Sequence, residues 1–336
     1  MKNTVVTMFG MVAGLVVALI LVLFVRQDIF VSPFSNSIAK PLSLKKYTFP
    51  QLRQSSLPIS KISITKKLDI DTKPPTYQFT FHDNEKKVSG VLMLPPEPGE
   101  YPVVVLFRGY VDKEIYSPGI GTKRFAEYLA QAGYITLAPD FLGYGDSDLP
   151  SFDFFEARFQ TYTTALTLLK SLDSANDALL QKKLKYTLDT SKVGLWGHSN
   201  GGHIALSVLA ITGQAYPTVL WAPVTKGFPD SVLTFANEME DGGKLIRSEV
   251  NKLKKNYTID HFNPALYYRW IDAPIQMHQG TGDDAVPLEW SDDFVDDMKA
   301  MNKEVDYYTY PKDDHNLKIY WGTAAARSVK WYNENL

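Results

Sequence analysis

The sequence predicts an α/β fold with a mostly parallel, twisted sheet covered by helices on both faces. Short apolar runs alternate with helix-length segments from about residue 100 onward, and this order is typical of parallel strands joined by crossover helices. The 336 residues are 45% hydrophobic and 21% charged, which is an ordinary balance for a globular protein.

The first distinct segment is an apolar stretch, residues 4–25, that contains no charged residue. A helix of this length would span the hydrocarbon core of a bilayer, which is roughly 30 Å thick. The apolar core of a cleaved signal peptide is shorter, about 7–15 residues. We therefore predict that residues 1–26 form a single-pass membrane anchor. The very short N-terminal tail before the anchor favours an extracytoplasmic position for the main domain. The basic residues after the anchor, Arg26, Lys40 and Lys45, do not support this orientation.

The anchor is followed by a stalk and then by one regular domain. Residues 27–75 mix Ser, Pro and Lys with short β-prone pieces, so we interpret them as a linker that could add a strand or two to the main body. Regular patterning begins at residue 76, and we predict one domain over residues 76–336. Between about residues 225 and 264 the alternation gives way to charged, irregular sequence with one helical stretch. We expect a small inserted cap there.

The elements of the main domain are predicted from their apolar patterns. An antiparallel strand pair should flank a turn at Asn84, and the continuous apolar run 101–109 should be a strand covered on both faces. The remaining strands are expected at 134–140, 193–198, 217–224, 274–280 and 305–311, and the helices at 122–133, 154–172, 200–211, 290–301 and 324–333.

Composition excludes several function classes. The chain has no cysteine, so it has no thiol nucleophile, disulfide or Cys-based zinc site. A formal net charge of −2 provides no basic surface for nucleic acid. No His-Glu-x-x-His or comparable ligand cluster is present. We therefore expect no metal, no cofactor and no nucleic-acid partner.

A serine between two glycines carries the strongest chemical signal. Ser199 stands in Gly-x-Ser-x-Gly, directly after an apolar strand and directly before a helix. A nucleophile on such a sharp turn needs small neighbours two residues away, here Gly197 and Gly201. By itself this pattern is weak and could be an ordinary glycine turn. Its position between strand and helix favours a nucleophile.

A serine hydroxyl needs a base, and four histidines follow it in the chain. His203 lies one helical turn beyond the serine, His261 falls in the expected cap, and His278 lies within a predicted strand. His315 follows the last predicted strand on a loop that could approach Ser199. We therefore predict that His315 is the base.

The acid that orients the base should follow the penultimate strand. Asp283 and Asp284 stand there, and we prefer Asp283; Asp284 would then be a solvated or loop-fixing carboxylate. Asp313 and Asp314 are too close in sequence to His315 to reach its far side easily, so we expect them to be surface charges.

An oxyanion intermediate would need two hydrogen-bond donors. The main-chain N–H of Asn200, directly after the nucleophile, is one candidate. The other should come from the loop after strand 101–109, and we choose the N–H of Tyr110. The Tyr110 ring is expected to cover the wall of the pocket.

Together these motifs resemble the α/β-hydrolase superfamily. The sequences GHSNGG, DFLGYGDSD, GTGDDAVP and the late histidine are most similar to the prolyl-oligopeptidase-like catalytic domain and its dienelactone-hydrolase and esterase relatives. The resemblance covers roughly residues 77–336. It implies a Ser199–Asp283–His315 triad that cleaves carboxylic ester or peptide bonds through an acyl-enzyme, acting on a small-molecule ester or a short peptide.

Two features depart from this family. Arg108 occupies the position where many relatives have histidine before the glycine. The large peptidases of the family also carry a propeller ahead of the catalytic domain, and the roughly 50 residues between the predicted anchor and the first predicted strand are too few for one. Two alternatives therefore remain open: a carboxylesterase or dienelactone-type hydrolase without peptidase activity, and a catalytically silent, membrane-anchored binding module.

Overall fold

A computed structural model describes residues 43–69 and 74–336 of the chain. Its contacts divide the chain into two units, Met1–Ser43 and Leu44–Leu336. All the strands and helices discussed below belong to the second unit. The predicted membrane anchor lies outside the described residues. Within those residues, no helix has both the length and the apolarity to cross a bilayer.

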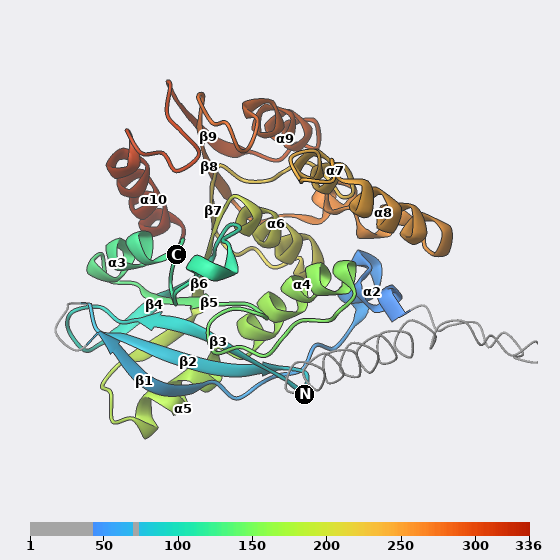
Figure 1. The fold of residues 1–336 in the computed structure, drawn as a ribbon. Helices are drawn as coiled ribbons and strands as arrows, with labels where there is room; N and C mark the ends of the chain where they lie inside the picture. Colours follow the sequence, from blue (N-terminus) through green and yellow to red (C-terminus); the bar gives the residue numbers. More distant parts are fainter. Residues whose placement is uncertain (1–42, 70–73) are drawn as a thin grey trace, which may run out of the picture. The chain divides into compact units, whose positions relative to one another are not determined.

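The centre of the fold is a nine-stranded sheet in the order β1-β2-β3-β5-β4-β6-β7-β8-β9 (Figure 1). Its strands are β1 Ser63–Asp69, β2 Thr76–Asp83, β3 Lys86–Met93, β4 Glu100–Phe107, β5 Ile135–Pro139, β6 Thr187–His198, β7 Thr218–Trp221, β8 Ile275–Gly280 and β9 Val305–Tyr310. Strands β1, β2, β3 and β5 pair antiparallel. From β5 through β4 to β9 every pair is parallel, so the carboxyl ends of these strands share one edge.

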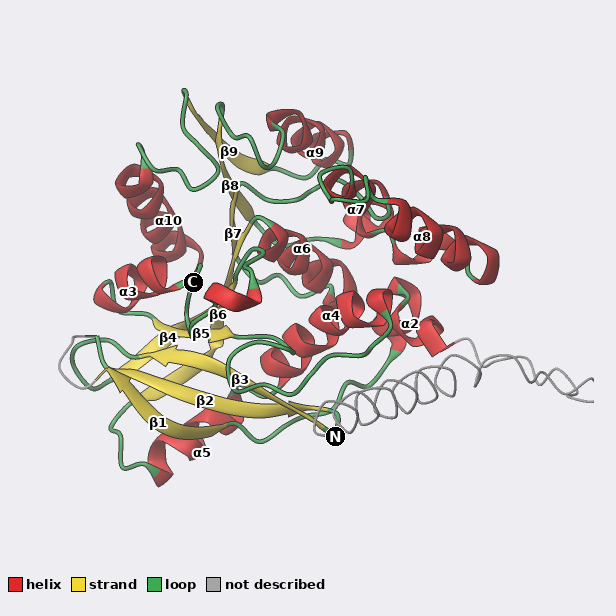
Figure 2. Cartoon of the chain, viewed as in Figure 1, coloured by secondary structure: helices red, strands yellow, loops and turns green. Residues whose placement is uncertain are grey.

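Helices cover both faces of this sheet (Figure 2). The α-helices of the fold are α2 Phe49–Gln54, α3 Lys123–Gln131, α4 Phe154–Lys170, α5 Asp173–Gln181, α6 Asn200–Thr212, α7 Asp230–Ala236, α8 Lys244–Asn256, α9 Leu288–Ala300 and α10 Trp321–Asn335. Helices α3 and α10 lie on one face, and α4, α6 and α9 lie on the other (Figure 1). The predicted α/β architecture is therefore confirmed.

Strand β4 illustrates how one apolar run serves both faces. Val103 and Val105 contribute to the core beneath α4 and α6. Val104 and Leu106 contribute to the core beneath α3 and α10. Because successive side chains of a strand point to opposite faces, a strand covered on both sides must be apolar at every position.

Three helices were not predicted from the sequence, and one of them, α2, lies within the predicted stalk. Helix α5 follows α4 almost without a break, and its sequence is rich in Asp, Ser and Asn, which favour turns. Helix α7 has only seven residues, fewer than a periodic pattern needs. The segment where we predicted a cap, about residues 225–264, contains α7 and α8. The antiparallel pair around Asn84 is present as β2 and β3, and β1 adds a strand at the sheet edge from within the predicted stalk.

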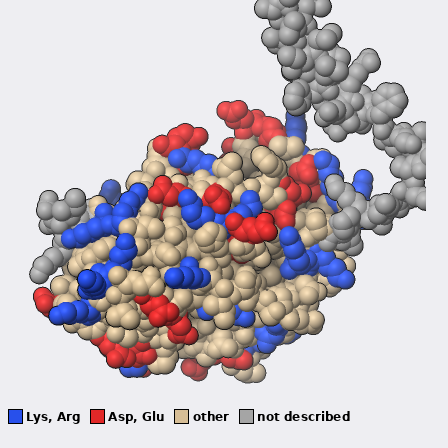
Figure 3. Space-filling model, turned by 90° about the horizontal axis from the view of Figure 1, so that it is seen from below, with Lys and Arg blue, Asp and Glu red and all other residues tan. Residues whose placement is uncertain are grey.

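Charged side chains are mixed on the molecular surface. On the face shown in Figure 3, Lys and Arg side chains are interspersed with Asp and Glu. This distribution agrees with the small net charge of −2.

Candidate active site

Ser199 stands on a strained turn between β6 and α6. Its backbone has φ 56° and ψ −123°, a conformation that costs a residue with a side chain about 1–3 kcal/mol. The surrounding chain holds it there: the N–H of Ser199 donates to the Trp221 carbonyl, and the N–H of Val224 donates to the Ser199 carbonyl, both at 3.0 Å. The end of β7 therefore fixes the position of the serine.

Only glycine fits at three positions beside Ser199, because a Cβ there would clash with neighbouring atoms. A Cβ on Gly201 would lie 1.8 Å from the Phe107 carbonyl oxygen, and one on Gly197 would lie 2.5 Å from the Gly201 carbonyl oxygen. A Cβ on Gly202 would lie 2.5 Å from the Pro223 side chain. Helix α6 begins in close contact with β4, β6 and the chain after β7, so no side chain fits at these positions.

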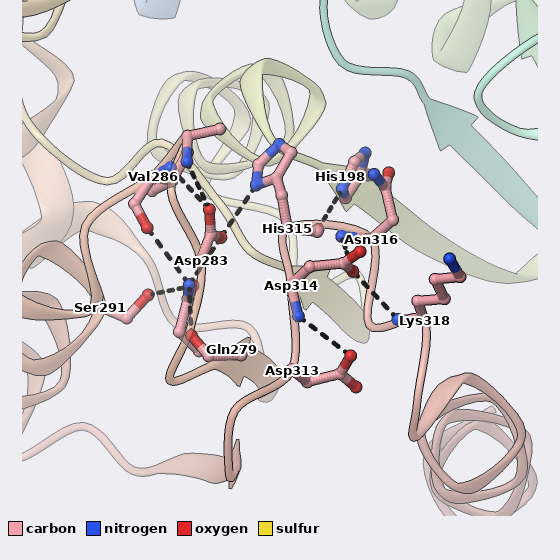
Figure 4. A network of polar contacts seen from close by, with 12 residues as sticks. His198, Gln279, Asp283, Val286, Ser291, Asp313, Asp314, His315, Asn316 and Lys318 are labelled. Carbon is pink, nitrogen blue, oxygen red and sulfur yellow. Dashed lines mark hydrogen bonds and ion pairs between the residues drawn. The ribbon is translucent and has the colours of Figure 1, made fainter.

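His315 and Asp283 form a hydrogen-bonded pair at the carboxyl edge of the sheet. Nδ1 of His315 donates to Oδ2 of Asp283 over 2.9 Å, and Figure 4 shows the imidazole directed toward this carboxylate. The side chain of Asp283 is fully buried, and that of His315 is 16% exposed. Asp284 is exposed. Of these two neighbouring carboxylates, Asp283 is therefore the one that meets the imidazole.

Asp283 is held as a carboxylate by its hydrogen bonds. Burial by itself would raise the pKa of Asp283, but the bonds from His315 and from the main-chain N–H groups of Val286 and Ala285 lower it below its usual value. Gln279 also donates to Oδ2 at 2.8 Å. An ionised, fixed carboxylate keeps the proton of the imidazole on Nδ1, and Nε2 is then free to accept a proton.

The loop that carries His315 is organised by Asp313, and here the prediction was wrong. We expected a surface charge, but Asp313 is fully buried. Its carboxylate accepts hydrogen bonds from the main-chain N–H groups of Asp314, Ile319 and Tyr320 at 2.9–3.0 Å. Because three donors of the loop converge on one carboxylate, the loop has a defined shape. Asp314 is half-buried and accepts from the N–H of Asn316 at 3.0 Å (Figure 4).

His198, the residue before the serine, supports His315, the predicted base. Its Nε2 donates to the main-chain carbonyl of His315 over 2.9 Å, from the side opposite Asp283 (Figure 4). The two imidazole centroids are 4.7 Å apart. Burial, together with the nearby His315, lowers the pKa of His198 to about 4, so this ring is neutral at pH 7. The sequence did not single out His198, because a contact with a residue so distant in the chain leaves no local signal.

The other candidate bases lie elsewhere. His278 is buried in β8, where its ring nitrogens contact the Tyr310 hydroxyl and the Gln276 side chain, each at 2.8 Å. His203 is buried against the Tyr162 hydroxyl, and His261 is exposed. Among the described residues, only His315 joins a buried carboxylate beside the serine turn.

The loop after β4 lies against Ser199. A Cβ on Gly109 would be 2.9 Å from the Cβ of Ser199, so Tyr110 follows the point of closest approach. No hydrogen bond to the main-chain N–H of Tyr110 or Asn200 is present in the described part of the chain. The Tyr110 ring is 76% exposed and its hydroxyl donates to Asp112. The ring therefore extends into solvent, and the expectation that it covers the wall of the pocket was wrong.

Arg108 holds the loop after β4 in place. Its guanidinium donates to the carbonyls of Gly109 and Asp140, both at 2.9 Å, and lies 4.0 Å from the ring centroid of Tyr144. It is only 6% exposed. The arginine thus ties the loop after β4 to the end of β5, a task for which the planar guanidinium is suited.

No hydrogen bond joins Ser199 Oγ to His315 within the described residues. Catalytic hydrogen bonds are often long without substrate and shorten when it binds. The same part of the chain contains no group of three His, Asp or Glu side chains placed to hold a metal ion.

A family model described as the prolyl oligopeptidase family matches residues 122–336, well over half of the chain. The chain belongs to the prolyl oligopeptidase family. It is therefore a serine hydrolase of the α/β-hydrolase superfamily, as the motifs predicted. It is 24% identical over 247 residues to the uncharacterized peptidase YtmA of Bacillus subtilis, covering 71% of this chain and 85% of that protein.

Members of the superfamily with solved structures share the fold. The acetyl xylan esterase from Paenibacillus sp. R4 is 17% identical, with a TM-score of 0.59 over 84% of this chain and 91% of the esterase. The acylaminoacyl peptidase from Pyrococcus horikoshii is 15% identical, with a TM-score of 0.53 over 84% of this chain. The chain spans 51% of the length of that peptidase. The prolyl oligopeptidase family fold is thus shared with both esterases and peptidases.

Proposed function

We propose that this serine hydrolase cleaves carboxylic ester or peptide bonds with Ser199 as nucleophile, His315 as general base and Asp283 as the group that orients the base. The observation that carries the proposal is the 2.9 Å bond between His315 Nδ1 and a buried carboxylate, on a loop held to the residue before a strained serine. A buried carboxylate, an imidazole and an elbow serine are the three parts that nucleophilic acyl transfer requires.

In the first half of the reaction an acyl-enzyme forms. Ser199 Oγ attacks the carbonyl carbon of the substrate, and its proton passes to Nε2 of His315. The carbonyl oxygen becomes an oxyanion, which the main-chain N–H groups of Asn200 and Tyr110 stabilise. The positive end of α6 adds to this stabilisation, because Asn200 is its first residue. The intermediate collapses, and the leaving alcohol or amine takes the proton from His315.

In the second half water replaces the leaving group. His315 removes a proton from water, the hydroxide attacks the acyl carbon, and the second tetrahedral intermediate is stabilised by the same two N–H groups. Collapse returns the proton to Ser199 Oγ and releases the acid. Asp283 remains ionised and stabilises the imidazolium in both halves.

A fluorophosphonate probe tests the nucleophile. The wild-type protein should be labelled at Ser199, and Ser199→Ala should abolish labelling while the protein stays folded by circular dichroism. Ser191→Ala is the matched control, since Ser191 is exposed near the start of the same strand. Labelling that persists in Ser199→Ala would reject this serine as the nucleophile, and a wild-type protein that is not labelled at all would favour the catalytically silent alternative.

A substrate panel separates the ester and peptide alternatives. Ester and amide hydrolysis use the same groups, so p-nitrophenyl esters and aminoacyl anilides should be compared by kcat/KM. Turnover of the anilides supports a peptidase. Turnover of esters alone supports a carboxylesterase without peptidase activity.

We also propose that residues 4–25 anchor the enzyme in a membrane, with the catalytic domain on the extracytoplasmic side. The argument is the length of this uncharged segment. The full chain should remain with membranes after carbonate extraction, whereas a chain that begins at residue 43 should be released. Protection of the domain from protease outside intact cells would contradict the orientation.

A further inference from the structure

An apolar loop, residues 149–154, is exposed directly before α4. Its sequence is LPSFDF. The ring of Phe152 is fully exposed, and the side chains of Leu149 and Phe154 are 64% and 44% exposed. Single apolar side chains on a surface are ordinary, but a cluster of them marks an interaction surface. The apolar loop is therefore a candidate docking site.

The polar groups of the apolar loop are bonded to the domain. The N–H of Ser151 donates to Oε1 of Gln160, and its hydroxyl donates to Oε2 of Glu156, both at 2.8 Å. Asp153 accepts a hydrogen bond from the N–H of Glu156 at 2.8 Å and thereby caps α4. Because these bonds hold the loop in one conformation, the exposure of its apolar side chains is fixed by the fold.

The apolar loop lies beside the point where the second unit of the chain begins. That unit starts at Leu44. The hydroxyl of Tyr47 donates to Glu156, which also binds Ser151, over 3.1 Å, and Figure 1 shows α2 next to α4 on this side. The proposed anchor, residues 4–25, is joined to Leu44 by a chain that spans at most about 60 Å. A bilayer that contains the anchor is therefore within reach of the apolar loop.

Lysine side chains surround the same point of the chain. The N–H of Leu44 donates to the hydroxyl of Tyr257 over 3.1 Å, so the end of α8 lies beside the start of the unit. Lys254 and Lys255 are exposed in the last turn of α8, and Lys45 is exposed next to Leu44. None of these three ammonium groups forms an ion pair with a carboxylate of the described residues. Apolar side chains flanked by lysines are typical of a surface that rests on anionic lipid.

The apolar loop also adjoins the segment after β4. A Cβ on Gly143 would lie 3.1 Å from Cδ of Pro150 and 3.2 Å from Nζ of Lys113, so the apolar loop and Lys113 meet over this glycine. Lys113 follows Tyr110 in the chain, on the loop that lies against Ser199. A surface that covered the apolar loop would therefore lie next to the segment that leads into the proposed active site.

We propose that the apolar loop inserts into the anionic surface of the bilayer that holds the proposed anchor. Leu149, Phe152 and Phe154 would enter the boundary between headgroups and acyl chains, and the lysines beside Leu44 would meet the lipid phosphates. No bond is made or broken in this docking. The proposal rests on the proposed anchor and does not depend on the reactivity of Ser199.

A single fluorescent label on the full chain tests the docking. The chain has no cysteine, so Leu149→Cys provides one site for an environment-sensitive nitrobenzoxadiazole label. In vesicles of phosphatidylcholine with about 30% phosphatidylglycerol, this label should emit at shorter wavelength and be quenched by doxyl groups on the lipid, at a depth of about 5–10 Å below the headgroups. Leu180→Cys is the matched control. Leu180 is exposed on α5, which follows the opposite end of α4, and its label should remain in water.

Variants assign the docking to particular side chains. With the label at position 149, the double change Phe152→Ser and Phe154→Ser should reduce lipid quenching by about 3-fold or more, because both apolar groups that accompany the label are lost. Leu180→Ser in the same labelled chain should have no effect. Vesicles of phosphatidylcholine alone should quench about 2-fold less, since the lysines then lack an anionic surface. Equal quenching in both kinds of vesicle would overturn the role of the lysines.

Three results would overturn the docking itself. One is a label at position 149 that stays as exposed to water as the label at position 180. Another is emission at shorter wavelength that lipid quenchers do not reduce, which would mean that protein, such as a second copy of this chain, covers the apolar loop. The last is unchanged quenching in the double serine variant. Vesicle flotation separates these results from a failure of the anchor: protein that does not float has no anchor and does not dock, whereas protein that floats with its label in water is anchored but not docked.

Discussion

The imidazole of His315 lies 2.9 Å from the carboxylate of Asp283, although the strand β9 and the helix α9 separate them in the chain. Parallel pairing of β8 with β9 brings the ends of both strands to the same edge, and each residue lies on the loop that follows its strand. The pair is thus a direct product of sheet topology.

Replacing the buried carboxylate should remove most of the activity. Asp283→Asn cannot hold the Nδ1 proton of His315 in place, so kcat for an ester substrate should fall by about 10⁴-fold, measured on protein with an unchanged circular dichroism spectrum. Asp284→Asn is the matched control, and its kcat should stay within about 2-fold of wild type because Asp284 is exposed. The reverse ranking of these two variants would move the acid to Asp284.

A methyl group at the serine turn should be destabilising. In Gly201→Ala the added Cβ would lie 1.8 Å from the Phe107 carbonyl oxygen, so α6 and β4 must separate, and we expect a loss of about 3 kcal/mol or more in unfolding free energy. Gly322→Ala, in α10, has nothing within 4 Å of its Cβ and should be neutral or up to about 1 kcal/mol more stable. Urea denaturation of both variants measures the difference. Similar stabilities would contradict the tight contact described here.

Arg108 should affect turnover more than substrate binding. A lysine in its place can reach only one of the carbonyls of Gly109 and Asp140, so the loop that carries the Tyr110 N–H would lose its position. We expect Arg108→Lys to lower kcat by about 10- to 100-fold with KM within about 3-fold. Arg53→Lys is the control, since Arg53 also donates to a buried carbonyl, that of Ala210, away from the site. A rise in KM at constant kcat would assign Arg108 to substrate binding.

Buried His278 should make the fold sensitive to acid. Burial, followed by the nearby Arg327, lowers the pKa of His278 to about 3, whereas an unfolded histidine titrates near 6.5. As the pH falls below about 6.5, His278 binds a proton in the unfolded state but not in the folded state. Its contribution to the free energy of unfolding is therefore fully present above that pH and is lost as the pH falls toward 3. Between pH 6.5 and 5 this histidine should account for about 2 kcal/mol of lost stability.

His278→Gln tests this pH dependence. The variant should lose about 2 kcal/mol less than wild type between pH 6.5 and 5 in urea denaturation. His261→Gln, at an exposed histidine, is the comparison for a change of charge alone. Parallel pH profiles for wild type and His278→Gln would show that His278 does not remain neutral in the folded protein.

Local patterns in the sequence were enough to predict most of the sheet and the position of each proposed catalytic group. Strand β4 was recognisable because burial on both faces leaves no polar position, and Ser199 because its turn admits only glycine at the flanking sites. Strand-end positions indicated Asp283 and His315. Asp283 was preferred to Asp284, and this choice agrees with the hydrogen bond to His315.

What sequence reasoning missed depends on contacts between distant segments. Asp313 stands in the charged run KDDH, which is typical of a surface loop, and its burial arises only because three main-chain N–H groups surround its carboxylate. Arg108 was noted as a departure from the family, but its bond to the Asp140 carbonyl joins two loops that the chain separates. No local pattern in the sequence indicates either arrangement.

The order of the sheet also bears on when the enzyme becomes reactive as it is synthesised. Ser199 leaves the ribosome long before His315, and His315 follows β9, the strand at the outer edge of the sheet. Until that edge strand docks onto β8, the nascent chain carries Ser199 without the histidine proposed as its base. On the proposed mechanism the growing polypeptide is therefore inert toward acyl compounds, and activity begins only when its final strand is in place.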